Sequence, residues 1–541
     1  MFVLDLNDTE IWRTSTAEPT TNGIIWMYAK DASNYLPLWK EPQKVIFDLG
    51  NLINSIYTGA YNATLTATFF AETDTVTAAD MILPISAEQS SAGFGSAWQV
   101  PQQNASSKLS IPQNVKRAVF TVSACGQIDE EFWWSNVLSS DTQTFPGNTL
   151  PGYSPFREVQ VLIDGELAGV AWPFPVIFTG GIVPGFWRPI VGIDTFDLRE
   201  DEIDITPWLS ILSDGQDHTY EIRVMGIADD GRGHGTLTTV GSYWVVSGKL
   251  FLWLDENGTT TTGSAISKIA PDPTFFLTST VNPANNGTNL TLSYQVLAKR
   301  QLSFASIITT SNGSQQASWT QTLSFSNAGN LSNDGNTQAN NQITTGVEVS
   351  SSGYSRKFTY PLFVWSTYSM SGNNITISAN MDRGKSAQVI GPSAFPNGAE
   401  SLTSNDTFNG ASFNTRQNGS AQYISNRDTS QSWGATEQYL TLSGVQTGPA
   451  SYPNFPTSQG MQLLYSRHVL AVNASVVQDS NPPPTGNSFE GEQSPFMGTA
   501  GESDLQGYAP PSQAKRLAWR HSRLQKRGHV NRGAASFGGF H

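Results

Sequence analysis

The chain has 541 residues, a formal net charge of −14 at pH 7 and a single cysteine, Cys125. Charged residues make up 14% of it, against about 25% in an average soluble domain, while 15 Trp, 16 Tyr and 28 Phe are present. This composition excludes a long coiled coil, and one cysteine cannot form an internal disulfide or a cysteine zinc finger. The acidic balance argues against nucleic acid as the main partner. No run of about 18 apolar residues is present that would span a membrane.

The first part of the chain, residues 1–79, predicts β-strands. Its run 62–70 alternates apolar residues with threonines, a period of two that is typical of a half-buried strand. Gln, Ser, Ala and Pro dominate around residues 80–108. We therefore expect a linker or loop there, between one β domain and the next.

Residues 109–256 predict a second β domain. The run 158–174 places Val159, Val161 and Ile163 on one face and then reaches Asp164-Gly165, a pair that favours a two-residue hairpin because both positions need positive φ. The runs 218–227 and 242–255 repeat the alternation. Short strands separated by turn residues indicate sandwiches or barrels.

The remaining chain divides by composition. Residues 257–477 are rich in Ser, Thr, Asn and Gly and predict a C-terminal β domain. Residues 478–541 predict a disordered linker and tail, of which 512–541 hold seven Lys or Arg and no Asp or Glu. A basic tail can bind nucleic acid or membrane, but a disordered extension or an error in the predicted gene is the favoured interpretation.

Three places combine charged and aromatic residues. IDEEFWWSN (128–136) and EIWRTSTAEPTTNGIIW (10–26) place carboxylates beside tryptophans, a mixture that carbohydrate sites use because indole faces stack on sugars and carboxylates accept hydroxyl hydrogen bonds. FTGGIVPGFWRPI (178–190) places Arg188 in a glycine-opened loop, and Arg suits amides and carboxylates. The structural alternatives are acidic turns beside core aromatics, and an Arg stacked on Trp187.

Other catalytic schemes find little support in the sequence. Metal-ligand spacings, phosphate-binding glycine loops and a GxSxG elbow are absent from it. Cys125 lies in an apolar strand-like run, where a small buried residue is the favoured interpretation. We therefore expect an enzyme, if this is one, to use carboxylates without a cofactor or metal.

Seven strings, in order, resemble one known family. They are EIWRTSTAEPTTNGIIWMYAKD, KVIFDLGNLI, EEFWWSN, FREVQVLIDGELAGVAWPFPVIFTGG, FWRPI, EIDITPW and YWVVSGKLFLWLD. Together they resemble the peptide-N4-(N-acetyl-β-glucosaminyl)asparagine amidase A family, the acid peptide N-glycanases of fungi and plants. The resemblance runs from residue 1 to about 475. It implies hydrolysis of the amide that joins an N-glycan to asparagine, with release of the glycan and conversion of Asn to Asp.

The resemblance also implies a fold and a site. The expected fold is all-β: two packed jelly-roll-like sandwiches, the first incomplete, then a C-terminal β domain and a disordered tail. Glu131 matches the family's catalytic Glu and would position water or protonate the leaving amine. Arg188 would bind the amide oxygen, and the remaining expected substrate contacts are Trp187, Trp133, Trp134, Glu18 and Asp164.

The family's essential aspartate falls before Met1 when counted back from Arg13. Asp5 and Asp8 lie nearby, but neither is followed by Arg, so the role is given to neither. We therefore expect the chain as printed to be N-terminally truncated, with residues 1–79 an incomplete first jelly roll. Inactivity of this chain through loss of that aspartate is an open alternative.

Two other functions are compatible with these residues, and the family also implies partners and a location. A catalytically inactive, glycan-binding β-sandwich protein is the runner-up, and a glycoside hydrolase with paired carboxylates is the third. The expected partners are N-glycosylated peptides or glycoproteins. The family implies a secreted, endomembrane or vacuolar protein, although MFVLDLNDTE is no signal peptide, and twelve N-x-S/T sequons agree weakly with secretion.

Overall fold

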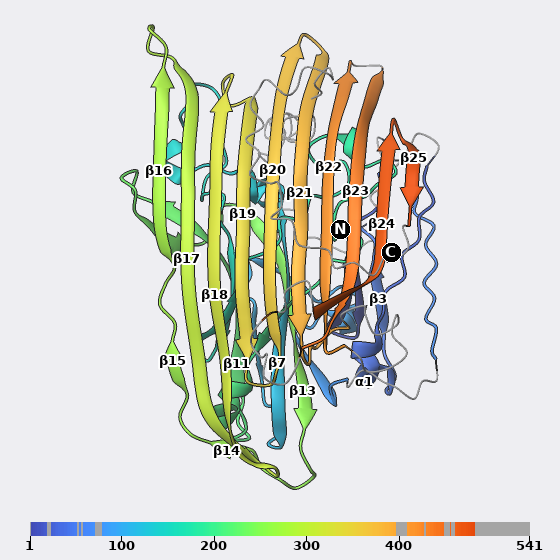
Figure 1. The fold of residues 1–541 in the computed structure, drawn as a ribbon, viewed down its shortest axis with the longest axis vertical. Helices are drawn as coiled ribbons and strands as arrows, with labels where there is room; N and C mark the ends of the chain where they lie inside the picture. Colours follow the sequence, from blue (N-terminus) through green and yellow to red (C-terminus); the bar gives the residue numbers. More distant parts are fainter. Residues whose placement is uncertain are drawn as a thin grey trace.

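The computed structural model describes residues 2–18, 23–50, 53–55, 58–70, 78–396, 408–426, 429–447, 455 and 460–481. The protein is built almost wholly from antiparallel strands, so the predicted all-β class is confirmed (Figure 1). Two four-residue α-helices, α1 (Leu36–Trp39) and α2 (Leu209–Leu212), are the longest helices among the described residues. None of the described helices has the length and apolar character needed to cross a membrane.

A three-stranded sheet forms the N-terminal layer. Its strands are β1 (Phe2–Leu6), β2 (Thr9–Thr14) and β3 (Val45–Asp48), in the order β2-β1-β3. Asn7 has a φ of 50° in the tight turn between β1 and β2, a conformation that Asn adopts more readily than most residues. Apolar residues of this sheet pack on Val119, Phe251 and Trp253 of the next layer.

Two five-stranded sheets form a sandwich in the middle of the molecule. One has the order β10-β7-β13-β4, with β5 also on β13, and the other has the order β12-β11-β8-β9, with β6 also on β11. Their bounds are β4 (Met81–Ile85), β5 (Trp98–Val100), β6 (Ser106–Leu109), β7 (Val115–Gln127), β8 (Glu158–Ile163), β9 (Glu166–Ala171), β10 (Asp201–Asp204), β11 (His218–Asp229), β12 (Gly235–Thr238) and β13 (Tyr243–Leu254).

The segment 80–108 is not the linker that its composition predicted. It supplies β4 and β5, which pair with β13, and most of β6, which pairs with β11. These strands are only three to five residues long, too short for the alternation to be recognised within a run rich in Gln and Ser. The hairpin expected at Asp164-Gly165 does form between β8 and β9, with φ values of 50° and 80°.

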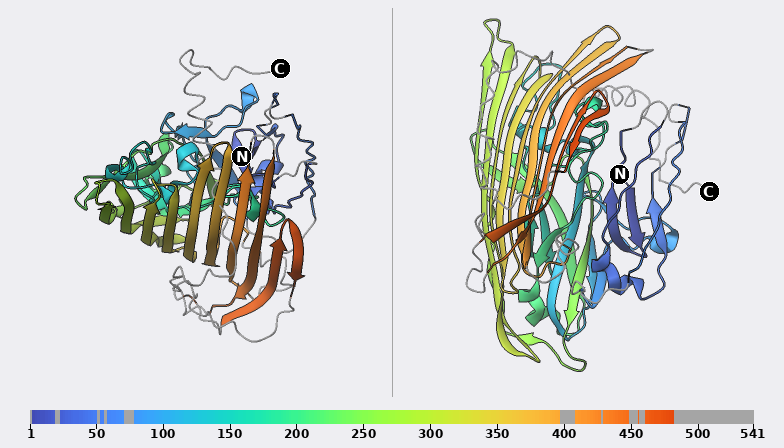
Figure 2. Two further views of the ribbon diagram at one scale, coloured as in Figure 1. Left: turned by 90° about the horizontal axis from the view of Figure 1, so that it is seen from above. Right: turned by 45° about the vertical axis from the view of Figure 1, so that its right-hand side comes forward.

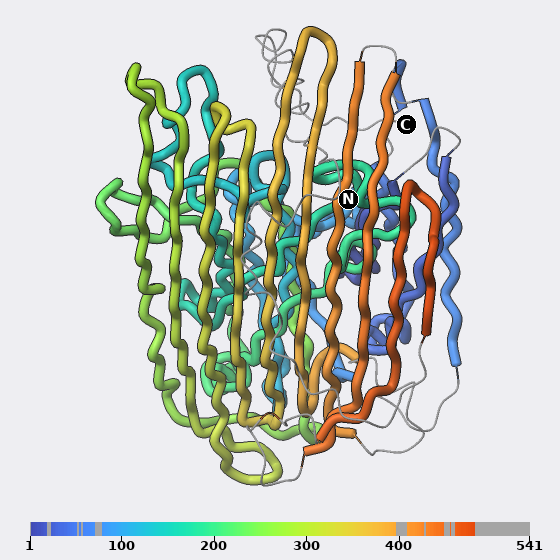
Figure 3. The backbone as a smooth tube through the Cα atoms, turned by 45° about the horizontal axis from the view of Figure 1, so that its top comes forward, coloured from blue at the N-terminus to red at the C-terminus, as the bar shows by residue number. Residues whose placement is uncertain are grey.

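A twelve-stranded antiparallel sheet covers the opposite side of the sandwich. From β17 onward each strand pairs with the next along the chain, as Figure 3 shows, and Figure 2 shows the sandwich lying between this large sheet and the small N-terminal one. The strands are β14 (Thr262–Gly263), β15 (Ser267–Ile269), β16 (Thr274–Pro283), β17 (Asn289–Thr310), β18 (Gly313–Ser332), β19 (Thr337–Ser350), β20 (Ser355–Ser371), β21 (Asn374–Ile390), β22 (Gly410–Ser425), β23 (Ser430–Val445), β24 (Met461–Val472) and β25 (Ser475–Ser480).

The main hydrophobic core crosses the predicted boundary between residues 256 and 257. One continuous cluster runs from Ile85 to Ala421 and joins the sandwich to the large sheet. Phe156 and Phe325 meet across this contact with ring centroids 5.3 Å apart. The sandwich and the C-terminal sheet therefore stabilise each other by shared apolar burial. Of the predicted disordered tail, residues 478–541, the first three belong to strand β25, which the composition did not reveal. Residues from 482 onward lie outside the described residues.

Candidate active site

Glu131 lies on a tight turn that follows the long central strand β7. A 3₁₀ turn over Ile128–Glu130 begins where β7 ends, and the Glu131 amide closes it by donating to the Ile128 carbonyl at 3.3 Å. Gly126 allows this close return, because a Cβ there would lie 2.2 Å from the Glu130 carbonyl oxygen. The Glu131 side chain is half-buried, whereas its neighbour Glu130 is buried.

The adjacent acids of the turn have different environments. Glu130 receives Arg157 Nε at 2.5 Å and Nη2 at 2.8 Å, and Trp244 Nε1 at 2.9 Å, with both members of the ion pair about 1% exposed. Arg157 Nη1 also donates to the carbonyls of Tyr153, Ser154 and Phe156. Glu130 therefore fixes the turn through a bidentate buried pair, and Glu131 is the acid that this turn presents.

The three tryptophans expected to stack on sugar are core residues. Trp133, Trp134 and Trp187 are 4%, 3% and 1% exposed. Trp133 packs on Trp244 with ring centroids 6.4 Å apart, and Trp134 packs edge-on against Phe132 at 6.1 Å. Their faces are covered by protein in this structure, so the stacking role predicted for them is not supported. The sequence could not show this, because exposed and buried aromatics look alike in a single chain.

The glycine-opened loop after β9 joins the Arg188 region to the N-terminal strand. Arg188 Nη2 donates to Glu18 Oε1 at 3.3 Å, and Thr179 donates to the Thr16 carbonyl. The Arg188 side chain is 28% exposed and that of Glu18 is 11% exposed. Two residues predicted separately, from segments 170 positions apart, are thus brought into one pair. The peptide bond between Arg188 and Pro189 is cis.

Gly181 connects this loop to the turn that carries Glu131. A Cβ on Gly181 would lie 3.3 Å from Phe132 Cε1 and 2.8 Å from the Phe178 carbonyl oxygen, so only glycine fits without displacement. Trp187 Nε1 donates to the Gly181 carbonyl at 2.7 Å. Phe132 follows Glu131 in the sequence, and Trp187 precedes Arg188. Glu131 and Arg188 are therefore each the chain neighbour of a side chain that contacts Gly181. The segments that carry Glu131 and Arg188 therefore meet at Gly181, and Arg188 in turn pairs with Glu18.

The Glu131 turn and the Arg188 loop each contain a residue with strained backbone. Ile128 has a φ of 64° and Ile182 a φ of 61°, in the left-handed region that a β-branched residue rarely adopts. Each such residue costs on the order of 1–3 kcal/mol and persists only where its surroundings impose it. Strain of this kind clusters at functional sites, which agrees with a site at the Glu131 turn and the Arg188 loop.

Asp164 lies away from this group. Its carboxylate accepts the Thr219 amide at 2.8 Å and lies 2.7 Å from His218 Nδ1, so it stabilises the β8–β9 hairpin. Arg157, the partner of Glu130, precedes the opposite end of β8, and a strand of this length spans roughly 20 Å. The expected substrate contact at Asp164 is therefore not supported, and the turn role that the sequence also allowed accounts for this residue.

A buried ionic network, which sequence reasoning missed, lies between the N-terminal sheet and β13. Arg13 holds Glu10 through Nε and Nη2, both at 2.7 Å, and Ser247 Oγ donates to Glu10 at 2.6 Å. Lys249 pairs with Glu200 at 2.7 Å. Burial alone would raise the pKa of Glu10, but Arg13, Lys249 and Ser247 together outweigh burial and lower that pKa. The network therefore keeps charges paired where the sheets meet.

The two aspartates near the N-terminus face a different segment. Asp8 accepts the Ser90 amide at 2.9 Å and the Ser96 hydroxyl at 2.8 Å. Asp5 is fully buried, and burial together with the charge of Glu10 raises its pKa to about 7. The Ser96 amide also donates to Asp5 at 3.4 Å, so both side chains contact the loop between β4 and β5.

Cys125 is not placed as a nucleophile. It lies near the end of β7 with its side chain buried, and burial raises the pKa of its thiol to about 11. A thiol with that pKa is almost wholly protonated near neutral pH and reacts poorly. Among the described residues, no group of three His, Cys, Asp or Glu is arranged to hold a metal ion.

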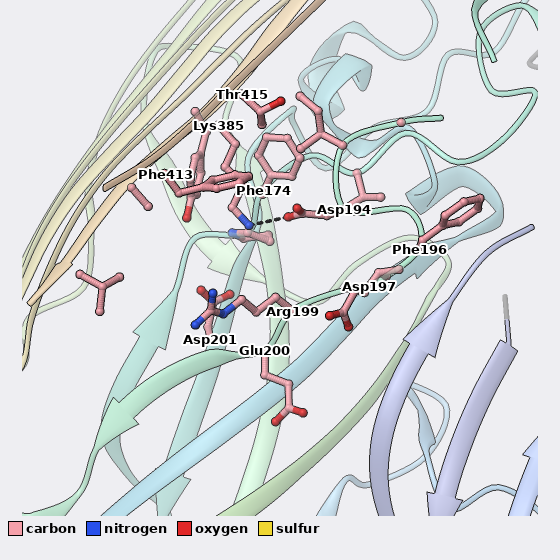
Figure 4. Close-up of a pocket in the computed structure, with 18 of the residues that line it drawn as sticks. Phe174, Asp194, Phe196, Asp197, Arg199, Glu200, Asp201, Lys385, Phe413 and Thr415 are labelled. Carbon is pink, nitrogen blue, oxygen red and sulfur yellow. Dashed lines mark hydrogen bonds and ion pairs between the residues drawn. The ribbon is translucent and has the colours of Figure 1, made fainter. Parts of the chain in front are cut away.

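A cavity of about 390 Å³ lies between the large sheet and the segment that follows the Arg188 loop (Figure 4). Strands β21, β22 and β23 form one wall, and residues 191–202 form much of the other. The lining mixes aromatic rings, such as Phe174, Phe196 and Phe413, with charged groups. Its walls come from segments some 200 residues apart, which is why no local pattern in the sequence revealed it.

The described elements define an all-β protein of stacked antiparallel sheets, with an acid and an Arg–Glu pair carried on its loops. A family model described as "Peptide N-acetyl-beta-D-glucosaminyl asparaginase amidase A" matches residues 1–271, and one described as "PNGase_A C-terminal domain" matches residues 293–362. The chain is 33% identical over 410 residues to the peptide-N4-(N-acetyl-beta-glucosaminyl)asparagine amidase A of Prunus dulcis, covering 71% of this chain and 68% of that protein. The chain therefore belongs to the peptide N-glycanase A family. No solved structure matches it.

Proposed function

We propose that this protein hydrolyses the amide between an N-glycan and asparagine in glycopeptides or glycoproteins, and that Glu131, Arg188 and Glu18 form the reacting end of its site. The observation that carries the proposal is their convergence: the Glu131 turn and the Arg188 loop both pack on Gly181, and Arg188 pairs with Glu18. An acid, a cation and a second acid in one partly buried place are the groups that amide hydrolysis needs.

Each residue has a distinct role in this proposal. Glu131, half-buried and carried by a rigid turn, positions the attacking water or protonates the departing glycosylamine nitrogen. Arg188 donates hydrogen bonds to the amide oxygen and stabilises the negative charge that develops there when water adds to the carbonyl. Glu18 is a positioning residue, because it orients the guanidinium from the side. The products are the glycan as a glycosylamine and a peptide with Asp in place of Asn.

The proposed substrate class also indicates a cellular location. N-glycosylated chains occur in the secretory pathway, so we propose a secreted, endomembrane or vacuolar location. The protein family agrees with this proposal.

Mass spectrometry of a glycopeptide tests the proposed reaction. The wild-type chain is expected to yield a free glycan and a peptide in which Asp replaces Asn. Glu131→Gln is expected to lower kcat by about 10²- to 10⁴-fold, the range for loss of a general acid or base. Glu256→Gln is the matched control, because it makes the same chemical change at an exposed glutamate beyond β13.

Three outcomes separate the candidate functions. Equal turnover by Glu131→Gln and wild type would remove Glu131 from the mechanism. Binding of the glycopeptide without any change in the peptide would favour the glycan-binding alternative. Cleavage between sugars, with a sugar stub left on Asn, would indicate a glycosidase.

A further inference from the structure

The cavity between β21–β23 and residues 191–202 has the composition of a carbohydrate site. Phe174, Phe196 and Phe413 line it and are each half-buried (Figure 4). Trp26 stacks on Phe196, and Arg383 and Lys385 lie over Phe174, so Phe413 is the ring that we expect to contact a sugar. Aromatic faces of this kind stack on the apolar faces of sugars. Its volume of about 390 Å³ falls within the roughly 300–1,000 Å³ of small-molecule sites.

The polar groups of the cavity are held in fixed orientations. Lys385 pairs with Asp194, and Arg356 pairs with Asp201 at 2.9 Å. Lys30 pairs with Asp197 at 2.6 Å. Carboxylates anchored in this way keep lone pairs on fixed axes for hydroxyl donors, which favours a ligand rich in hydroxyl groups.

Thr415 gives an independent indication of a ligand. It is 5% exposed and lines the cavity, and its Oγ1 has no hydrogen-bond partner among the residues that the structure describes. A buried hydroxyl left unpaired carries a free-energy cost. A ligand hydroxyl bound in the cavity would relieve that cost, because a hydroxyl both donates and accepts.

The charge of the lining predicts which sugars fit. The lining holds five carboxylates, Asp194, Asp197, Glu200, Asp201 and Glu202, and three cations, Arg199, Arg356 and Lys385. Lys30 and Lys249 pair with Asp197 and Glu200, so the local charges balance. A space without net charge gives a carboxylate-bearing sugar no attraction to offset the loss of its water. Neutral sugars are therefore favoured.

The cavity also lies within reach of the proposed reacting end. The Ser15 amide donates to the Thr195 carbonyl at 2.8 Å, and Thr195 follows Asp194, which lines the cavity. Glu18 is three residues beyond Ser15, so at most about 11 Å of chain separates it from that contact. An oligosaccharide whose first sugar lies at Arg188 and Glu18 is long enough to enter the cavity.

We propose that this cavity binds neutral sugar residues of the N-glycan that lie beyond the scissile amide. The inference rests on the proposed function for the direction in which the glycan enters. It assigns the sugar-stacking role to Phe413, in place of the buried tryptophans. Thr415 supplies a hydrogen bond to a sugar hydroxyl.

Binding of a free, uncharged oligomannose N-glycan tests this inference without any turnover. Calorimetry is performed on the full chain carrying Glu131→Gln. Phe413→Ala is expected to weaken binding by about 2- to 12-fold, the equivalent of one aromatic contact of roughly 0.5–1.5 kcal/mol. Thr415→Val, which preserves shape, is expected to weaken it by a similar factor through loss of one hydrogen bond.

Tyr439→Ala is the matched control. Tyr439 lies on β23 between Gln438 and Leu440, which line the cavity, so its ring is on the opposite face of the same sheet. Unchanged affinity for Tyr439→Ala supports the cavity as the site. Equal losses in all three variants, or none in Phe413→Ala and Thr415→Val, would overturn it.

Kinetics separates this inference from the proposed function. For a glycopeptide with a full oligomannose chain, Phe413→Ala is expected to raise KM with little change in kcat, whereas a substrate with only the two innermost sugars is expected to be unaffected. Equal effects on both substrates would overturn the inference. If no glycopeptide is hydrolysed but the oligosaccharide binds through Phe413 and Thr415, the proposed reaction is wrong and the cavity site stands.

A glycan that ends in carboxylate-bearing sugars provides the last comparison. It is expected to bind more weakly than the neutral chain, because its carboxylate loses water without gaining a net attraction. Tighter binding of the acidic glycan would contradict the selectivity drawn from the charge of the lining.

Discussion

The two neighbouring acids of the Glu131 turn should respond oppositely to the same substitution. Glu130→Gln removes the counter-charge of Arg157, which is buried and 2.5–2.8 Å from both carboxylate oxygens. Breaking a buried pair from one side costs about 3–5 kcal/mol, because the remaining ion is left without compensation. Glu131→Gln changes a half-buried side chain and should alter the unfolding free energy by no more than about 0.5 kcal/mol.

Urea denaturation followed by tryptophan fluorescence measures the unfolding free energy of each variant, and glycopeptide turnover measures its activity. Trp244 donates to Glu130, so its emission should report on this region. We expect Glu130→Gln to lower the denaturation midpoint, and Glu131→Gln to lower kcat with the midpoint unchanged. Replacing both Glu130 and Arg157 by apolar residues of similar volume should recover much of the lost stability.

The opposite pattern would refute this reasoning. If Glu130→Gln unfolds at the wild-type urea concentration, the buried pair does not stabilise the turn. If Glu131→Gln is destabilised by several kcal/mol and still turns over glycopeptide, Glu131 is the structural acid. Either result would require the roles of the two residues to be exchanged or abandoned.

Further predictions concern pH, a buried cation and the cysteine. Burial is the first cause that raises the pKa of Asp5 and of Glu348, in each case to about 7. Between about pH 4 and 7 the folded state therefore holds protons that the unfolded state has lost, so the unfolding free energy should fall as the pH rises through this range. Denaturation curves measured across it should show a smaller fall for Asp5→Asn. Arg383 is fully buried, donates through Nη2 to one carbonyl at 2.9 Å, and has its pKa lowered by burial to about 9. Because burial of this cation is unfavourable, Arg383→Met should raise the thermal midpoint of unfolding. A lower midpoint would show that the contacts of Arg383 outweigh the cost of its desolvation. Cys125 should resist thiol reagents until the chain unfolds, and rapid labelling of the native protein would contradict its burial.

The sequence predicted the features that depend on local pattern. Alternating residues and the Asp164-Gly165 turn were sufficient to predict an all-β fold and one hairpin, because strand period and turn chemistry are local properties. The pairing of Glu18 with Arg188 was not predictable, although each residue was singled out, because it depends on how two distant segments meet.

The sequence alone could not predict the features that depend on burial. Glu130 and Glu131 are the same residue type at adjacent positions, and only packing shows which one is paired with Arg157. The tryptophans of the same turn were expected at a sugar because their type fits both a core and a binding site. The cavity required strands β21–β23 to meet residues 191–202, a contact that no short window contains.

The shared core across residues 256 and 257 has a consequence for how the protein is made. During synthesis the sandwich strands leave the ribosome before the sheet that covers them, so Glu158 emerges well before Arg300, its buried partner. Until β17 and β18 arrive, Phe156 also lacks Phe325. The nascent chain therefore exposes an apolar, partly charged face for the time taken to translate roughly 140–170 residues, about 7–34 s at typical rates. We therefore expect chaperones to bind that face, and fragments that stop near residue 256 to aggregate.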